Sequence, residues 1–469
     1  MDFEENDAPN APDKFHNQTS LVDVPVIAGV DYVDIGILKG YRRHARTHSK
    51  KQQKSFERIL REIGFRIPVL AEMDGTIISG HLRVSIAKKI GYTKIPVIWV
   101  RDLSPAQIRA FRLADNRLAE LGEWDQETLA LELQDLIELD YDLDFTGFEP
   151  PEVDVIIDGA LGGGADAAAN DIPELEKIVV SKLGDKWLLD EHQVVCGDAR
   201  DSTSYDALLQ GRLAQLTITD LPYGIPIAGN VSGLGKIKHD DFIMGAGEMS
   251  EAELETFFYE TAACAVRYAE DGSLGYWFID WRNLHILERV LRRLYDRHLN
   301  TCVWAKSNGG MGSMYRSRHE LVLVFKKGTA PHINNIQLGK YGRNRTNVWE
   351  YDGCSTGTKD RRADLALHPT VKPAEMIADA IKDASTRGGL ILDPFLGSGT
   401  TIIACEMTGR ICAGLELDPK YVDVIVRRWE AYTGGNAIHA ESGLTFAEMR
   451  ELRNGKQLLL PPPAAAGEV

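Results

Sequence analysis

A carboxylate and an aromatic ring follow directly after a short apolar run. The β-branched run from Leu216 to Asp220 predicts a strand, and Leu221, Pro222 and Tyr223 come next. An exocyclic amino group is a poor nucleophile, because its lone pair is conjugated with the ring that carries it. Hydrogen-bond acceptors on its N–H groups stabilise the positive charge that develops when the nitrogen attacks. Asp220 and the backbone carbonyl of Leu221 can supply these acceptors, and the ring of Tyr223 can stack on a flipped-out base.

A second loop is rich in glycine and lies between an apolar strand and a helix. The strand covers residues 389–393, and Gly397 and Gly399 follow it. Glycine lets the backbone approach a ligand where a Cβ would collide. Glu416 ends the next strand, about 20 residues further on, where it can accept both hydroxyls of a ribose. The motif G-x-G-x-x-G is absent, so the loop suits an adenosine carrying a sulfonium and an amino acid better than a dinucleotide.

Each loop alone would also fit an ordinary structural turn. Asp393 before the glycines and Glu416 after them favour a ligand site. His319 and His368 have no third ligand at a useful spacing, so we expect them to pack or hydrogen-bond and expect no metal. The six cysteines form no C-x-x-C pair and are expected to be reduced thiols.

Elements that could position these loops occur in the second part of the chain. Strand and helix patterns alternate there, which predicts a mostly parallel sheet with helices on both faces. The predicted organisation is a disordered N-terminus (1–20), a first α+β domain (21–122), a helical extension (123–158), a flexible Gly/Ala-rich linker (159–172), a second α/β domain (173–450) with an insert at about 225–367, and a tail (451–469).

The composition limits the classes of protein that this sequence can represent. The 469 residues carry a formal net charge of −16, which argues against indiscriminate coating of nucleic acid but not against local basic patches. The longest apolar runs are too short to span a membrane, and the acidic N-terminus has no apolar signal core. We therefore expect a cytoplasmic protein with no membrane partner.

Together, these segments resemble the beta class of amino-group DNA methyltransferases. Asp220–Tyr223 resembles the family motif D/N/S-P-P-Y/F/W, with Leu221 in place of the first proline. The family uses the backbone carbonyl at that position, which Leu retains, although the fixed φ of proline is lost. Asp393–Thr401 matches the cofactor motif D-P-F-x-G-S-G-T-T without departure. The resemblance covers residues from about 175 to 435 and implies a Rossmann-like fold that binds S-adenosylmethionine.

Further segments carry the same resemblance. Residues 368–373 resemble the loop that shelters the methionine end of the cofactor, and residues 196–199 resemble the segment whose acid reaches the adenine. Residues 318–320, followed by an apolar strand, also match the family. The cofactor-binding residues implied by the resemblance are Asp198, Thr370, Lys372, Asp393, Phe395, Gly397, Gly399, Thr400, Thr401 and Glu416.

The first part of the chain resembles the ParB-like N-terminal domain, which is fused to methyltransferases of phage and prophage. Residues 78–83 and 114–117 carry this resemblance, over residues from about 28 to 120. It implies a smaller domain for DNA binding or dimerisation. Alternatively, Gly80, His81 and Arg83 could cradle the phosphates of a nucleoside triphosphate.

The resemblance implies site-specific methylation of double-stranded DNA, as in restriction-modification, on adenine N6 or cytosine N4. Asp rather than Ser at position 220 favours adenine. A homodimer is an open expectation. The predicted DNA contacts are Arg42, Arg43, Arg46, Lys50, Lys51, Lys236, Lys238, Arg343 and Arg345. Two alternatives remain: N-methylation of RNA or protein, and a nucleotide-switched ParB-like module whose methyltransferase half is vestigial.

Overall fold

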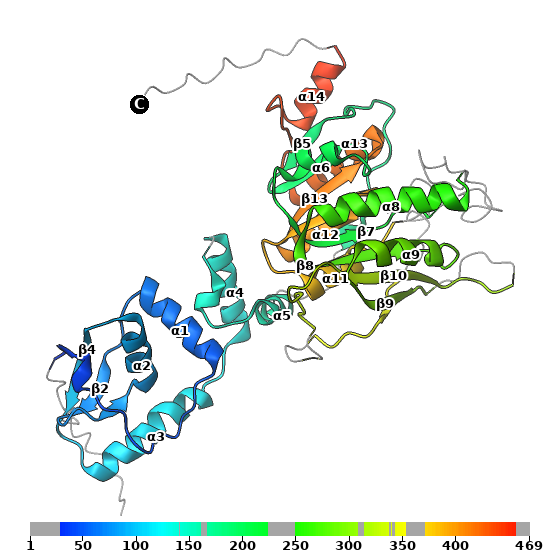
Figure 1. Ribbon diagram of the computed structural model, residues 1–469. Helices are drawn as coiled ribbons and strands as arrows, with labels where there is room; N and C mark the ends of the chain where they lie inside the picture. The colour runs from blue at the N-terminus through cyan, green and yellow to red at the C-terminus, as the bar shows by residue number, and fades with distance from the viewer. Residues whose placement is uncertain are drawn as a thin grey trace, which may run out of the picture. The chain divides into compact units, whose positions relative to one another are not determined.

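The chain divides into two compact units, which are described separately. The computed structural model describes residues 29–139, 141–160, 167–223, 249–307, 314–336, 339, 343–352 and 371–455. The first unit contains residues 1–125 and 142–147, and the second contains residues 126–141 and 148–469. Figure 1 shows their elements.

The first unit is a small sheet covered by helices, as expected for an α+β domain. Its strands have the order β1-β4-β2-β3, and β2 and β4 run parallel. The elements are β1 (Asp31–Asp34), α1 (Lys50–Glu62), β2 (Val69–Glu72), β3 (Ile77–Ser79), α2 (His81–Ile90), β4 (Lys94–Val100) and α3 (Pro105–Leu121). Val69, Ile95 and Val97 are fully buried in its core. The turn between β2 and β3 contains Gly75 at φ 87°, where a Cβ would collide with the carbonyl of Ile37.

The second unit is built around a ten-stranded sheet with the order β11-β9-β10-β8-β7-β12-β13-β6-β5-β14. The strands are β5 (Lys186–Leu189), β6 (His192–Cys196), β7 (Ala214–Thr219), β8 (Ala269–Ile279), β9 (Arg297–Ala305), β10 (His319–Lys326), β11 (Val348–Glu350), β12 (Leu390–Asp393), β13 (Ile411–Glu416) and β14 (Ile438–His439). The central strands β8, β7, β12, β13 and β6 run parallel to their neighbours within this set. Their carboxyl ends therefore lie at one edge of the sheet.

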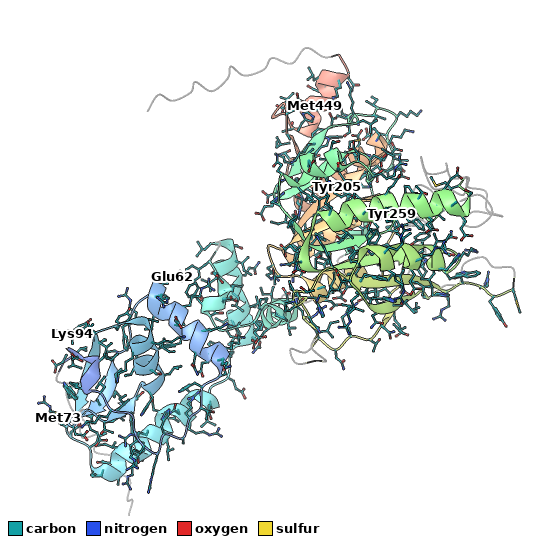
Figure 2. The ribbon with its side chains drawn as sticks, viewed as in Figure 1. Glu62, Met73, Lys94, Tyr205, Tyr259 and Met449 are labelled. Carbon is teal, nitrogen blue, oxygen red and sulfur yellow. The ribbon has the colours of Figure 1, made fainter. Side chains whose placement is uncertain are left out.

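Helices cover both faces of this sheet, as expected for an α/β domain. They are α6 (Ser202–Leu209), α8 (Glu251–Arg267), α9 (Leu284–Leu294), α11 (Ala374–Ala384), α12 (Thr400–Thr408), α13 (Pro419–Thr433) and α14 (Phe446–Arg453). Successive side chains of a strand point to opposite faces, so Ile391 packs with α11, α12 and α13, while Leu392 packs with α6, α8 and α9. Tyr205 of α6, labelled in Figure 2, is buried and stacks on Tyr268 with ring centroids 5.1 Å apart. The expected Rossmann-like architecture is confirmed.

One antiparallel strand begins at the edge of the sheet where the parallel strands end. Strand β10 pairs with β8 in the antiparallel sense, and Leu321 lies opposite Ile279. The start of β10 therefore lies beside the carboxyl end of β8. Because of this reversal, Glu320 reaches the edge at which the parallel strands end.

The second unit also contains α4 (Gln126–Glu138) and α5 (Pro150–Ala160), which fall mainly within the predicted helical extension. Asp154 of α5 is 1% exposed and accepts hydrogen bonds from Arg410 Nη1 and Nη2 at 3.1 and 2.7 Å. Arg387 Nε lies 2.9 Å from the same carboxylate. Since these three charges are buried together, they attach α5 firmly to the body of the sheet domain.

Part of the predicted flexible linker is packed against the sheet domain. Residues 167–170 form a short 3-10 helix, and Ala169 is fully buried. The Ala169 carbonyl accepts a hydrogen bond from Arg428 Nη2 at 2.7 Å, and Asn170 Oδ1 accepts one from the backbone N–H of Ala374 at 3.0 Å. These polar contacts hold this segment against α11 and α13. Among the helices of the described ranges, none is long and apolar enough to cross a bilayer.

Candidate active site

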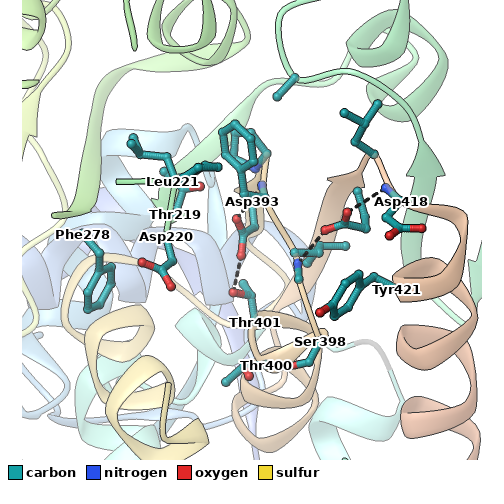
Figure 3. A pocket seen from close by; sticks show the side chains of 18 of the residues that line it. Thr219, Asp220, Leu221, Phe278, Asp393, Ser398, Thr400, Thr401, Asp418 and Tyr421 are labelled. Carbon is teal, nitrogen blue, oxygen red and sulfur yellow. Dashed lines mark hydrogen bonds between the residues drawn. The ribbon is translucent and has the colours of Figure 1, made fainter. Parts of the chain in front are cut away.

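The carboxyl ends of adjacent parallel strands surround one cavity of about 520 Å³. Strands β6, β7, β12 and β13 are followed or ended by Asp198, Asp220, Asp393 and Glu416, all of which line it. In open α/β sheets, ligands bind at this edge. In Figure 3, Asp220 lies on one side of Asp393, and Asp418 lies on the other.

The glycine-rich loop is held by hydrogen bonds to two buried carboxylates. Asp393 accepts from the backbone N–H of Phe395 at 3.1 Å and from the Thr401 hydroxyl at 2.5 Å, which ties β12 to the first turn of α12. Glu416 accepts from the backbone N–H of Gly397 at 2.9 Å and from that of Asp418 at 2.9 Å. The loop conformation is therefore fixed by the acids of the two neighbouring strands.

The two glycines of this loop have different roles. Gly399 caps α12 at φ 84°, and a Cβ there would lie 3.2 Å from the side chain of Ile425. Gly397 has φ 52° and lines the cavity, with nothing within 4 Å of the position of a Cβ. A side chain at Gly397 would thus project into space that a ligand could occupy.

Burial weakens the acidity of both carboxyl groups that hold this loop. It raises the pKa of Asp393 to about 6 and that of Glu416 to about 7, despite the hydrogen bonds that each accepts. A ligand that donates hydroxyl hydrogens to Glu416 would favour its charged form.

Charged groups cluster around Asp220, which lines the cavity together with Tyr223 and Lys372. Lys372 Nζ lies 2.5 Å from Asp220 Oδ2 and 3.0 Å from Glu320 Oε2. The Tyr223 hydroxyl lies 2.5 Å from Asp220 Oδ1 and 2.8 Å from Glu320 Oε2, and its single proton can be donated to only one of them at a time. Lys306 forms an ion pair with the other oxygen of Glu320. We call Asp220, Tyr223, Lys306, Glu320 and Lys372 the charged cluster.

The members of the charged cluster titrate differently. Burial raises the pKa of Asp220, although Lys372 opposes this shift. Burial acts in the same direction on Glu320, but the charges of Lys372 and Lys306 outweigh it and lower the pKa of Glu320 to about 2. Burial lowers the affinity of Lys372 for its proton, yet the two neighbouring carboxylates raise its pKa on balance. Lys372 is therefore a charged ammonium with two carboxylate partners.

The catalytic-type loop is anchored even though Leu221 replaces the proline of the family motif. The Leu221 side chain is 1% exposed and packs in the core. Asn283 Nδ2 donates a hydrogen bond to the Tyr223 backbone carbonyl at 2.6 Å. Packing and this hydrogen bond supply the restraint that proline would have supplied through φ.

In the loop after β6, Asp198 is paired with its neighbour Arg200. Its carboxylate accepts from Arg200 Nε at 3.1 Å and from Arg200 Nη2 at 2.7 Å. Burial would raise the pKa of Asp198, but its hydrogen bonds with Arg200 lower it overall. Asp198 is thus an ionised acceptor in the wall of the cavity.

The structure brings most of the predicted site residues together. The predicted residues that line the cavity are Asp198, Asp220, Leu221, Pro222, Tyr223, Lys372, Asp393, Phe395, Gly397, Thr400, Thr401 and Glu416. Thr370, Lys236 and Lys238 lie outside the described residues. Lys372, which the resemblance assigns to the cofactor, is paired with Asp220.

Sequence reasoning missed two residues of this site, Glu320 and Phe278. Residues 318–320 match the family, but the sequence assigns no role to Glu320, because its partners Tyr223 and Lys372 are distant in the sequence. Phe278 of β8 lines the cavity, and Lys372 Nζ lies 5.4 Å from the centre of its ring. An apolar residue within a strand gives no separate signal of a site.

The prediction that Arg343 and Arg345 contact DNA is corrected by their surroundings. Their side chains are only 10% and 16% exposed. Arg343 Nη2 lies 2.5 Å from Asp383, and Arg345 Nη1 lies 2.8 Å from Asp379. Both arginines are engaged by acids of α11, one of which, Asp383, is only 3% exposed, so their charges are already paired within the protein.

The predicted DNA contacts of the first unit are at its surface. Arg42, Arg43, Lys50 and Lys51 are exposed. Arg46 is half-buried and donates a hydrogen bond to Asn116 Oδ1 at 2.7 Å. The exposed members of this group can be approached by a phosphate from solvent.

The described geometry does not support a nucleotide site at Gly80, His81 and Arg83. Gly80 precedes α2 at φ 106°. Arg83 Nη1 donates to the backbone carbonyls of Ile67 and Pro68, both at 2.9 Å. Burial lowers the pKa of His81 to about 4, so its ring is neutral. The described residues also contain no group of three His, Cys, Asp or Glu side chains that could hold a metal.

Comparison with known proteins identifies two family matches in this chain. Residues 214–427 match the family model described as DNA methylase, of the N6/N4 type. Residues 127–183, which include α4 and α5, match the model described as the ParB-methyltransferase HTH domain.

The chain is also similar to individual proteins. The chain is 40% identical over 96 residues to the type II methyltransferase M.ScaI of Streptomyces caespitosus, covering 20% of this chain and only 32% of that protein. It is 24% identical to the type II methyltransferase M.HpaI of Haemophilus parainfluenzae, over 52% of this chain and 76% of that protein. The solved structure of the PvuII DNA methyltransferase, which is cytosine-N4-specific, aligns at 14% identity and a TM-score of 0.40, over 61% of this chain and 95% of that one. A match at this score does not bear on function.

Proposed function

We propose that this chain, whose residues 214–427 match the DNA methylase model of the N6/N4 type, methylates the exocyclic amino group of a DNA base with S-adenosylmethionine as the donor. The observation that carries the proposal is that Asp220 and Gly397 line the same cavity. They follow β7 and β12, which are adjacent and parallel. A ligand on the glycine-rich loop would therefore lie within reach of the carboxylate.

The cavity supplies groups of suitable chemistry for each end of S-adenosylmethionine. Glu416 would accept the ribose hydroxyls, and Asp198 would accept from the adenine amino group. Gly397 leaves space beside the loop for the rest of the ligand, since no atom lies within 4 Å of the position of a Cβ there. The bound cofactor would supply an electrophilic methyl on a sulfonium.

The target base would be flipped out of the duplex and bound beside Asp220. Asp220 and the Leu221 carbonyl would accept the two N–H groups of its amino nitrogen, which favours attack on the methyl. Tyr223 and Phe278 are aromatic side chains of the cavity on which the base could stack. We propose adenine N6 ahead of cytosine N4, because the acid of the loop is Asp rather than Ser.

The decisive experiment supplies S-adenosylmethionine labelled in its methyl group, together with duplex DNA, and separates the nucleosides after digestion. We expect label in N6-methyladenine. Label in N4-methylcytosine would change the base but keep the mechanism. Label in 5-methylcytosine, a preference for RNA in direct competition, or no label in DNA under any condition would refute the proposal.

A further inference from the structure

Lys372 and the target base compete for the same carboxylate. Asp220 must accept a hydrogen bond from the amino group of the target base, yet its two oxygens are already bound by Lys372 Nζ and the Tyr223 hydroxyl, each at 2.5 Å. Lys372 is only 5% exposed, so solvent does not replace Asp220 as a partner of its ammonium. Each oxygen of Asp220 can accept a second hydrogen bond, but Asp220 can turn toward the base without leaving these two donors unpaired only if another acid holds them.

Glu320 is placed to hold both donors. Its Oε2 lies 3.0 Å from Lys372 Nζ and 2.8 Å from the Tyr223 hydroxyl. Glu320 belongs to β10, whereas Tyr223 follows β7 and Lys372 precedes α11, so its carboxylate is positioned by a separate strand of the sheet. Its second oxygen is bound by Lys306, which fixes the carboxylate from the other side.

We propose that Glu320 is a positioning residue for methyl transfer: it retains Lys372 and the Tyr223 hydroxyl when Asp220 turns to bind the amino group of the base. This inference rests on the proposed function and adds a residue to its mechanism. Without Glu320, the ammonium of Lys372 would have Asp220 as its sole acidic partner within the charged cluster, and would hold that carboxylate away from the base.

The first test is Glu320→Gln, which preserves shape and removes the charge. We expect kcat with saturating DNA and cofactor to fall about 10²-fold, the scale on which a misplaced catalytic group acts. The dissociation constant for S-adenosylmethionine should stay unchanged, because Glu320 is not among the residues proposed to hold the cofactor, such as Asp198, Gly397 and Glu416. Glu320→Asp should restore part of kcat.

A pH profile separates positioning from a merely structural role. The charged or titratable groups around Asp220 are Tyr223, Glu320, Lys372 and, from β12, Asp393. The negative charge of Glu320 contributes to the raised pKa of Asp220. In Glu320→Gln the pKa of Asp220 should therefore be lower, and the decrease of kcat on the acid side of its pH profile should occur at lower pH.

The companion variant is Lys306→Met, which removes a cation from the far side of Glu320. Glu320 would then attract Lys372 more strongly, so Lys372 would stabilise the charge of Asp220 less and the pKa of Asp220 would rise. The decrease of kcat on the acid side of its pH profile should therefore occur at higher pH. Glu350→Gln is the matched control, because Glu350 is an exposed carboxylate of β11 in the same sheet. It should leave kcat and the profile unchanged.

The outcomes are distinguishable. Wild-type kcat and an unshifted profile in Glu320→Gln, or shifts of both variants in the same direction, would overturn the role of Glu320. If Glu320→Gln does not fold, as judged by thermal melting and cofactor binding, Lys306→Met decides: a shift to higher pH supports the inference, and no shift overturns it. Absence of methyl transfer by the wild-type protein would instead refute the proposed function.

Discussion

The acidic side chains of the cavity are compensated by different means. Asp198 and Asp220 are balanced by cations, whereas Asp393 and Glu416 depend on hydrogen-bond donors of the backbone and of a hydroxyl. Arg200 lowers the pKa of Asp198 and Lys372 opposes the rise in the pKa of Asp220, whereas burial raises the pKa of Asp393 to about 6 and that of Glu416 to about 7. The cofactor half of the cavity should therefore respond to pH near neutrality.

Replacing Asp220 should separate catalysis from cofactor binding. Asp220→Ala removes the proposed acceptor for the amino group of the base and leaves Asp198, Gly397 and Glu416 in place. Methyl transfer should therefore fall by at least about 10³-fold. The dissociation constant for S-adenosylmethionine, measured by calorimetry, should change by less than about threefold, which corresponds to less than about 1 kcal/mol. Unchanged turnover would remove Asp220 from its role.

The affinity for S-adenosylmethionine should depend on the ionisation of Glu416. The pKa of Glu416 is about 7 in the free protein, and hydroxyl donors on the ligand favour the carboxylate. Affinity should therefore rise with pH up to about 8 and level off above it, with at most about a tenfold decrease per pH unit on the acid side. Calorimetric titrations across this range test the prediction. Glu416→Gln should bind more weakly and show no such dependence; the same slope in the variant would assign it to another group.

Among the elements, those with a local signal can be predicted from the sequence. The β12–loop–α12–β13 unit is predictable because its glycines, its apolar strands and Glu416 lie close together in the sequence. The pairing of Lys372 with Asp220 is not, because it joins side chains 152 positions apart. The burial of Arg343 and Arg345 cannot be predicted for the same reason. Their acidic partners in α11 are distant in the sequence, so the basic run alone does not show whether such partners exist.

Helices α4 and α5 match an HTH model but contain no positively charged side chain that could contact a DNA phosphate. From Gln126 to Glu176 the sequence has no Lys, Arg or His, although it has many Asp and Glu residues. DNA-binding modules of this type contact phosphates with basic side chains. Asp154 of α5 instead binds Arg410 and Arg387 in the interior. We expect these helices to serve the second unit structurally.

Asp154 should be important for the stability of the second unit. Asp154→Ala would leave Arg410, whose side chain is fully buried, without its carboxylate, at a cost of about 3–5 kcal/mol in the free energy of unfolding. Asp158 of the same helix pairs with Lys382 but is 36% exposed, so Asp158→Ala should cost less than about 1 kcal/mol. Scanning calorimetry of the two variants measures the contrast. Equal melting temperatures would show that the buried ion group does not fix α5.

At the scale of the whole molecule, a net charge of −16 must be reconciled with the proposed action on DNA. The basic side chains exposed on the first unit offer a local solution, because phosphate binding depends on nearby charges rather than on the total. Basic residues packed against the large sheet can be paired with acids instead, as Arg343 and Arg345 show.

The first unit should therefore supply much of the non-specific affinity for DNA. Combining Arg42→Ala, Arg43→Ala and Lys50→Ala should weaken binding at about 0.1 M salt and reduce the slope of log K against log salt by about 0.9 for each phosphate that is no longer neutralised. Arg292→Ala is the control, since this exposed arginine of α9 is paired with Glu288. Titrations of duplex DNA at several salt concentrations measure the slope. An unaltered slope in the triple variant would contradict this assignment.

The strand order also has a consequence for how the protein is made. β7 and β12 are neighbours in the sheet, but β8, β9, β10 and β11 are synthesised between them. During translation, the ribosome releases the loop that carries Asp220 long before its partner strand exists, and such distant pairings are slow to form. A nascent chain interrupted before β12 would therefore have an open sheet edge and would lack the proposed methylating activity, which only nearly completed chains could have.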